Sequence, residues 1–182
     1  MLREAGYEFL IHPADLDELA VAAATETTTD DLPLFLARAK AEAIAASFPA
    51  DIILAADTIV ALNSQVIGKA ADADDARRIL GMLSGSTHRV ITGIALLCRD
   101  SGLFLSETVS STVEMNALTP SQIEAYIATN HWRGKAGAYG IQDTDTFVRR
   151  ITGCLTNIVG LPMTTTARLL REAGIGKPRI ND

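Results

Sequence analysis

One apolar run with a single carboxylate dominates the middle of this chain of 182 residues. Residues 53–62 read Ile-Leu-Ala-Ala-Asp-Thr-Ile-Val-Ala-Leu, and a short turn leads from them to Gly68 and Lys69. The run predicts a buried strand over residues 52–62 that continues into a hairpin or a bent arm. Removing a lone ionised carboxylate from water costs several kcal/mol. We therefore expect Asp57 either to face a cleft at the end of the strand or to be paired.

Asp57 and Lys69 allow two interpretations. A carboxylate and an ammonium group that face one cleft would suit a metal-bound phosphate substrate. The alternative is a structural ion pair beside a turn. These two residues alone favour the structural pair.

The composition indicates an ordinary folded domain. Apolar residues make up 48% of the chain, enough for a sizeable core, and the length fits one domain or one domain with two lobes. The net charge is −6, so the chain lacks the basic character of a nucleic-acid-binding protein. No apolar run approaches the roughly 20 residues that cross a bilayer, and the first residues lack the apolar core of a signal peptide. We expect a cytoplasmic protein with no nucleic-acid or membrane partner, which would bind phosphates through local cations or a divalent metal.

The spacing of the cysteines and histidines predicts neither a disulfide framework nor a zinc site. Cys98 and Cys154 form no Cys-x-x-Cys pattern, and His12, His88 and His131 have no zinc-binding spacing. We expect two buried thiols in a reducing compartment. His88 is expected to cap or orient a loop.

Apolar periodicity and turn residues predict helices and strands in alternation. Strands are expected at residues 7–12, 52–62, 89–97, 103–115 and 147–151, and helices at 31–48, 72–84, 119–129 and 164–173. Asp31, Asp72 and Thr119 are expected to begin or cap three of these helices. Residues 20–31, with four threonines, are expected to form a surface loop, and Gly93 indicates a bulge or a close backbone approach. Together these elements predict an α/β fold with a mixed twisted sheet and helices on its faces.

Two kinds of side chain could carry phosphate chemistry. The carboxylate candidates are Asp17, Glu18 and Asp57. They suit a hard divalent cation, which is often held by one or two carboxylates together with substrate phosphates and water. The cation candidates, which could bind phosphate oxygens, are Lys40, Lys69, Arg133 and Lys135. Taken singly, such an acidic pair is more often a solvated turn, and such a lysine more often lies on the surface.

A glycine-rich stretch near the C-terminal third has the composition of a functional loop. Residues 131–142 read His-Trp-Arg-Gly-Lys-Ala-Gly-Ala-Tyr-Gly-Ile-Gln, with three glycines and the only tryptophan of the chain. A simple connection between elements requires neither repeated glycines nor a tryptophan, so we expect a loop shaped for binding or catalysis.

Several runs, each weak alone, together resemble the Maf family of nucleoside triphosphate pyrophosphatases. They occur in the family's order and cover most of the chain. The runs are Asp17-Glu18, Ala39-Lys40-Ala41, residues 56–60, Gly68-Lys69, residues 83–85 with 88–90 and 92–93, residues 132–142 and residues 157–162.

The resemblance implies a fold and an activity. The family fold is α/β, related to the inosine triphosphate pyrophosphatases, with two lobes around a cleft, and a homodimer is implied. Family members hydrolyse a nucleoside triphosphate between the α and β phosphates, and they require a divalent cation, Mg²⁺ or Mn²⁺. The run 136–142 resembles the dTTP/UTP branch more than the 7-methyl-GTP branch.

The resemblance also implies roles for particular residues. Asp57 matches the proton acceptor, and Glu18 with Asp57 would hold the metal. Lys40 and Lys69 would bind phosphate oxygens. The positions tied to base preference are Thr58 and Gln142, and an amide can offer a donor and an acceptor to a pyrimidine.

The first residues depart from the family pattern. Family members begin with a strand and a Ser-x-Ser-x-Arg-Arg loop that grips phosphate, whereas residues 1–6 match the end of the helix that follows it. We expect either that the true start lies upstream of Met1 in a single, N-terminally truncated domain or that the enzyme is impaired. The alternative functions are therefore a non-catalytic nucleotide-binding or regulatory protein and a 7-methyl-GTP pyrophosphatase.

Overall fold

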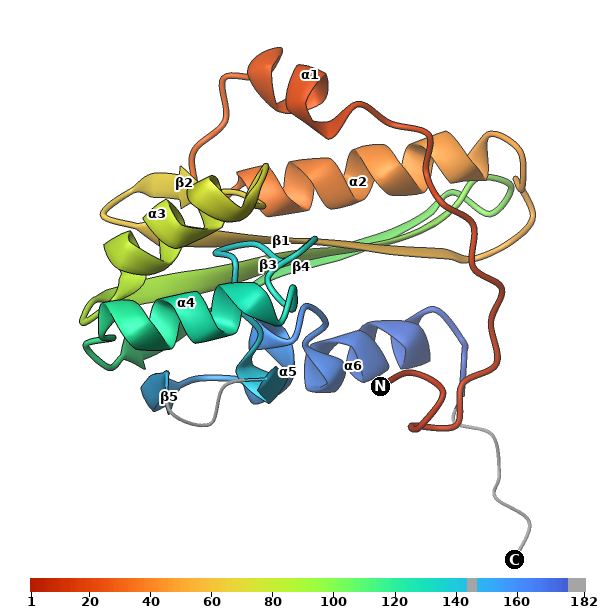
Figure 1. Ribbon diagram of the computed structural model, residues 1–182. Helices are drawn as coiled ribbons and strands as arrows, with labels where there is room; N and C mark the ends of the chain where they lie inside the picture. Colours follow the sequence, from red (N-terminus) through yellow and green to blue (C-terminus); the bar gives the residue numbers. More distant parts are fainter. Residues whose placement is uncertain (144–146, 177–182) are drawn as a thin grey trace, which may run out of the picture. The chain divides into compact units, whose positions relative to one another are not determined.

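The chain forms two compact units, and its three longest strands contribute residues to both. The computed structural model describes residues 1–143 and 147–176 (Figure 1). Unit 1 comprises residues 1–57, 92–109 and the described residues from 161 onward, and unit 2 comprises residues 58–91 and the described residues of 110–160. The shared strands are β1 (Ile53–Leu62), β3 (Thr87–Cys98) and β4 (Leu103–Met115).

Five strands form one sheet in the order β2-β1-β3-β4-β5. The short strand β2 (Gln65–Ile67) pairs antiparallel with β1, and β5 (Val148–Thr152) pairs antiparallel with β4. The turn between β3 and β4 is closed by a hydrogen bond of 3.2 Å from the backbone N–H of Gly102 to the carbonyl of Arg99. The predicted α/β fold is confirmed.

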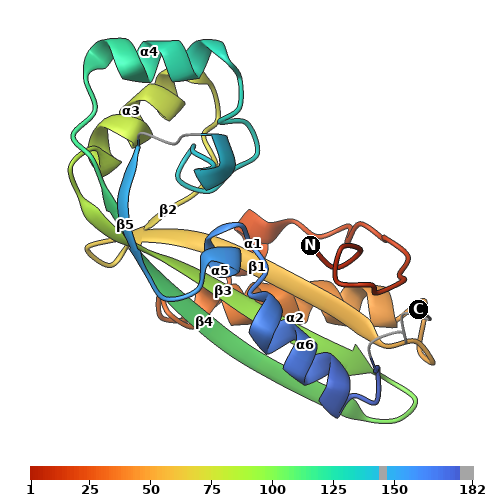
Figure 2. The same ribbon diagram turned by 90° about the horizontal axis from the view of Figure 1, so that it is seen from below.

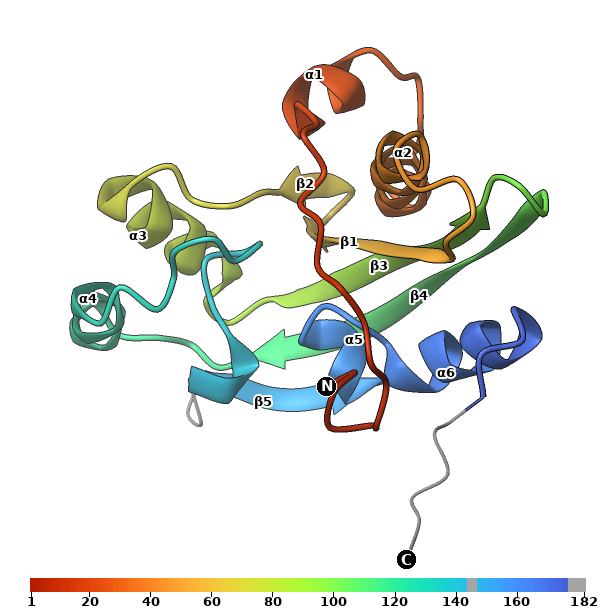
Figure 3. The same ribbon diagram turned by 90° about the vertical axis from the view of Figure 1, so that its right-hand side faces the viewer.

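In unit 1, the helices α2 (Leu32–Ala45) and α6 (Met163–Glu172) cover opposite faces of the sheet (Figures 2 and 3). Successive residues of a strand point to opposite faces, and the packing in unit 1 follows this alternation. Ala95 packs with Ala37 of α2, whereas its neighbour Ile94 packs with Leu169 of α6. The strand is therefore apolar on both faces, which explains its continuous hydrophobic sequence.

The strand β3 passes closest to α2 at Gly93. A Cβ atom built at Gly93 would overlap the backbone of Pro33 and Leu34 at the start of the helix. The predicted close backbone approach is confirmed, because glycine alone leaves room for the helix there.

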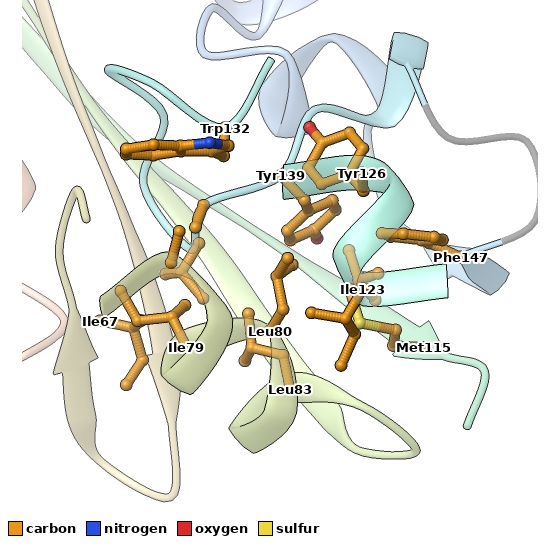
Figure 4. Packing of buried hydrophobic residues seen from close by; sticks show 14 of the residues in the cluster. Ile67, Ile79, Leu80, Leu83, Met115, Ile123, Tyr126, Trp132, Tyr139 and Phe147 are labelled. Carbon is orange, nitrogen blue, oxygen red and sulfur yellow. The ribbon is translucent and has the colours of Figure 1, made fainter. Parts of the chain in front are cut away.

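In unit 2, α3 (Ala73–Leu83) and α4 (Pro120–Ala128) lie side by side (Figure 2). Asp72 caps α3 by accepting a hydrogen bond of 2.8 Å from the backbone of Asp75, and Thr119 forms the predicted capping box with Gln122. Both helices contribute to one apolar core (Figure 4). The large side chains of this core include Ile79, Leu80, Leu83, Met115, Ile123, Tyr126, Trp132, Tyr139 and Phe147.

The region before α2 differs from the prediction. Residues 7–12, all of them described, form no strand, and Leu10 and Ile11 are exposed. The helix α1 (Glu18–Ala23) replaces part of the predicted loop, because Asp17 caps it by accepting a 3.0 Å hydrogen bond from the backbone of Ala20. Asp31 precedes α2 but makes no side-chain cap, since its carboxylate accepts a 2.7 Å hydrogen bond from the Thr28 hydroxyl.

The remaining described elements are short. They are the helix α5 (Leu155–Ile158) and the 3-10 turn η1 (Ile141–Asp143). Both cysteines are free thiols, with Cys98 buried and Cys154 half-buried, so the prediction of two buried thiols holds fully only for Cys98. Among the described helices none is long and apolar enough to cross a membrane.

Candidate functional site

Three of the predicted site residues meet in unit 1. The Nζ atom of Lys40 lies 2.9 Å from Oε1 of Glu18 and 2.6 Å from Oδ1 of Asp57. Glu18 begins α1, Lys40 lies in the third turn of α2, and Asp57 lies in the middle of β1. Asp57 is thus paired, as its position in an apolar strand required, and the cation that pairs with it is Lys40.

The packing of α2 explains why Lys40 reaches Asp57. Ala37 and Ala41 are fully buried against the sheet, and their small side chains let the helix approach closely. Lys40 lies beside this alanine stripe, at its border. From there its side chain turns toward the strand, although a lysine at such a border usually extends into solvent.

The cluster is partly shielded from water. The side chain of Asp57 is 10% exposed, that of Lys40 19% and that of Glu18 38%. Burial by itself lowers the pKa of Lys40, but hydrogen bonds and charge attraction from Asp57 and Glu18 outweigh burial and raise the pKa above its usual value. Lys40 is therefore an ammonium group throughout the neutral pH range.

The two carboxylates also suit a divalent metal. Carboxylate oxygens are the ligands that Mg²⁺ and Mn²⁺ prefer. No group of three or more His, Cys, Asp or Glu side chains that could hold a metal ion occurs among residues 1–143 and 147–176. Two carboxylates supply only part of the coordination shell of such an ion, so a metal held here would take its other ligands from substrate oxygens and water. Asp17, the third carboxylate candidate, caps α1 instead.

In unit 2, the structure brings Lys69 to the glycine-rich loop. Lys69 pairs with Ala136 in an isolated antiparallel bridge, and the backbone N–H of Gly137 donates a 3.1 Å hydrogen bond to the carbonyl of Gly68. The side chain of Lys69 is exposed. Two of the runs that the sequence singled out are thus neighbours in space.

The other cation candidates in this loop have structural partners. Lys135 forms an ion pair with Asp143. The guanidinium of Arg133 lies over the ring of Trp132, 4.5 Å from its centroid. Neither needs a phosphate group to explain its place.

The two residues that the resemblance links to base preference lie in unit 2 as well. The hydroxyl of Thr58 donates a hydrogen bond of 3.4 Å to the carbonyl of Gly160. Gln142 lies in η1, at the end of the glycine-rich loop, and is exposed. Its amide is therefore accessible to a ligand.

One buried polar network was missed by the sequence analysis. Asn157 is fully buried, and its Nδ2 donates to the carbonyl of Val90 at 2.9 Å and to Oγ of Ser111 at 3.0 Å. The same Ser111 hydroxyl accepts a 3.0 Å hydrogen bond from the backbone of Cys154. The network fixes the turn that ends at Gly160. The sequence feature that could have predicted this network is the asparagine within the apolar run 154–162.

His88 also has a defined place. It is a buried residue of β3, and its Nε2 lies 2.7 Å from the hydroxyl of Tyr139 in the glycine-rich loop. Burial lowers the pKa of His88 to about 4, so the imidazole is neutral at neutral pH. The structure agrees with the expectation that His88 orients a loop.

This chain, with its α/β fold and its cluster of carboxylates around Lys40, belongs to the Maf-like family. The sequence pattern of that family, described as Maf-like protein, matches residues 1–173. The resemblance inferred from the separate runs is confirmed.

Three relatives illustrate the similarity, and each is named dTTP/UTP pyrophosphatase. The protein from Anaeromyxobacter dehalogenans strain 2CP-1 is 40% identical over 98% of this chain and 90% of its own length. The relative from Pyrococcus furiosus is 38% identical over 90% of this chain and 84% of its own. The relative from Cereibacter sphaeroides is 43% identical over 91% of this chain and 83% of its own.

Proposed function

We propose that the protein is a nucleoside triphosphate pyrophosphatase that acts on dTTP and UTP and on modified forms of these nucleotides. It would cleave the bond between the α-phosphorus and the bridging oxygen, releasing a nucleoside monophosphate and pyrophosphate. Family membership and the activity named for the three relatives support this proposal. The single observation that carries it is the ammonium group of Lys40 held between the carboxylates of Glu18 and Asp57.

Asp57 would act as the proton acceptor. A water molecule that donates a hydrogen bond to its carboxylate would be oriented for attack on the α-phosphorus and would give up a proton to Asp57 as the new oxygen–phosphorus bond forms. The hydrogen bond from Lys40 fixes the carboxylate, because it occupies Oδ1. An ammonium group has three N–H donors, so Lys40 could hold a phosphate oxygen while it keeps its two carboxylate partners.

Glu18 and Asp57 would hold a divalent metal, Mg²⁺ or Mn²⁺. When bound, such a metal would polarise the phosphate oxygens and neutralise charge on the departing pyrophosphate. Lys69 would bind a phosphate oxygen, and Thr58 and Gln142 would contact the base. We also propose a cytoplasmic location, since that compartment contains the nucleotide pool, and a homodimer, which sedimentation velocity would measure.

The test of the chemistry is the identity of the products. The protein is incubated with a panel of nucleoside triphosphates, including 7-methyl-GTP, with Mg²⁺ or Mn²⁺, and the products are separated by ion-exchange chromatography. We expect pyrophosphate and a nucleoside monophosphate from dTTP and UTP. Release of orthophosphate would contradict the proposed cleavage position, and binding without hydrolysis would favour a regulatory protein.

The test of the site is Asp57→Asn, which keeps the shape of the side chain but removes its basicity. We expect kcat to fall by a factor of about 10² or more, as is usual for the loss of a general base. Asp51→Asn is the matched control, because Asp51 is exposed and lies just before the same strand. Full activity of a folded Asp57→Asn variant, verified by circular dichroism, would remove Asp57 from its proposed role.

A further inference from the structure

Beneath the glycine-rich loop lies a buried imidazole that the proposed mechanism does not use. His88 is 1% exposed and Tyr139 is 6% exposed. Their rings meet edge to face with centroids 5.6 Å apart, and the hydrogen bond between Nε2 and the tyrosine hydroxyl is 2.7 Å long. Both side chains are almost inaccessible to water, so breaking this bond would leave a buried polar group without a hydrogen-bond partner.

The same loop is tied down at the residue that follows Tyr139. The backbone N–H of Gly140 donates a 3.2 Å hydrogen bond to the buried hydroxyl of Tyr126 in α4. A Cβ atom at Gly140 would overlap the side chains of Lys135 and Asp143, which pair across the loop. Residues 139–143 are therefore attached to β3, to α4 and to the start of the loop itself.

Gln142 lies inside this attached segment. Its side chain is exposed, whereas the tyrosines that hold the neighbouring backbone are buried (Figure 4). A loop that is ordered before its ligand arrives loses less conformational entropy on binding. The buried anchors would therefore act on the affinity for the nucleotide and not on the bond-breaking step.

We infer that His88 and Tyr139 are positioning residues, which hold the loop in the conformation that presents Gln142 to the nucleotide base. This inference rests on the proposed function, since it assigns the two residues to the binding of its substrate. The opposing view is that the pair only packs the core of unit 2. The two views differ in what the loss of one hydroxyl does to the loop and to KM.

The test uses Tyr139→Phe, which removes the hydroxyl and keeps the ring. Tyr126→Phe is a second variant, which removes the bond to Gly140, so the inference stays testable if one variant folds poorly. Tyr7→Phe is the matched control, because Tyr7 is also buried but belongs to unit 1.

The first measurement reports the order of the loop and needs no activity. Trp132 is the only tryptophan, is 1% exposed and lies in this loop. We expect acrylamide quenching of its fluorescence, and deuterium exchange in residues 134–143, to increase in Tyr139→Phe and Tyr126→Phe at temperatures where both remain folded. The control should match the wild type. Unchanged quenching and exchange in both loop variants would overturn the inference.

The second measurement is the steady-state kinetics of dTTP hydrolysis. We expect KM to rise about tenfold in Tyr139→Phe, as the loss of one buried hydrogen bond implies, with kcat changed by less than about twofold. If part of the variant were unfolded and the rest were normal, the apparent kcat would be lower and KM would be unchanged. That result would overturn the inference. If the wild type hydrolyses no triphosphate, the proposed function fails, whereas the quenching experiment still decides whether the hydroxyl orders the loop.

Discussion

His88 stays uncharged in the folded protein because it is buried. Its pKa is about 4 in the folded state, against about 6.5 in an unfolded chain. Between these two pH values, the unfolded chain binds a proton that the folded protein does not bind. The free energy of unfolding therefore decreases as the pH falls from about 6.5 to 4, by about 3 kcal/mol in total for this one residue.

The prediction for His88 is a pH-dependent difference in stability. Urea denaturation at pH 7 and pH 4.5 should show that the wild type loses about 2 kcal/mol more than His88→Gln over this interval, because the glutamine does not titrate. His131→Gln is the control, since His131 is exposed. Equal losses in the wild type and in His88→Gln would contradict the prediction.

At the scale of single residues, the sequence identified the members of the cluster but not their pairing. A paired Asp57 needs a cation, and Lys69 is the candidate nearest to it along the run that contains both residues. The partner is Lys40, which is 17 positions away. Residue types alone cannot rank two lysines, because the choice depends on where α2 packs, and that depends on the alanines and on Gly93.

The helix α2 carries Lys40, and Gly93 sets how closely this helix approaches the sheet. Gly93→Ala should lower the free energy of unfolding by about 1–3 kcal/mol, since the new methyl group would overlap the helix backbone. It should also reduce turnover, because a displaced helix moves the ammonium group away from Asp57. Urea denaturation and the dTTP assay measure the two effects.

Gly81→Ala is the matched control for Gly93→Ala. Gly81 lies in α3, and a Cβ atom there would meet no atom within 4 Å. Alanine is the better helix former, so stability should rise by about 0.5–1 kcal/mol. Similar effects of the two substitutions would show that Gly93 is not a point of close contact.

At the scale of elements, the sequence predicted the long ones and the short strand β5 (Val148–Thr152) but failed in the region before α2. The strands β1, β3 and β4 and the helices α2, α3, α4 and α6 lie within a few residues of their predicted bounds. The predicted strand at residues 7–12 is wrong, because alternation creates a strand only where a sheet offers a partner. The helix α1 has only six residues and depends on the cap at Asp17, which the threonine-rich surroundings concealed.

For the whole molecule, the net charge of −6 opposes the binding of a triphosphate. The proposed phosphate binding would therefore depend on a few local cations and on the proposed metal. The sequence predicted this reliance on local cations or a metal, because the composition determines the total charge. It could not predict that two of the loop cations, Arg133 and Lys135, are engaged by Trp132 and Asp143.

Metal removal tests this dependence. EDTA should abolish dTTP hydrolysis, and an excess of Mg²⁺ or Mn²⁺ should restore it. The Tm should not change in EDTA, because the part of the chain that the structure describes has no cluster of three or more metal-binding side chains. EDTA already saturated with Mg²⁺ is the control. Full hydrolysis in metal-free buffer, or a large drop in Tm, would contradict the proposed role of the metal.

The bracketing of Lys40 by two carboxylates also affects how this amine reacts with electrophiles. Acyl phosphates and thioesters are attacked only by an uncharged amine, and the raised pKa of Lys40 keeps that form scarce. Spontaneous acylation by such electrophiles would therefore be slow at the amine beside Asp57.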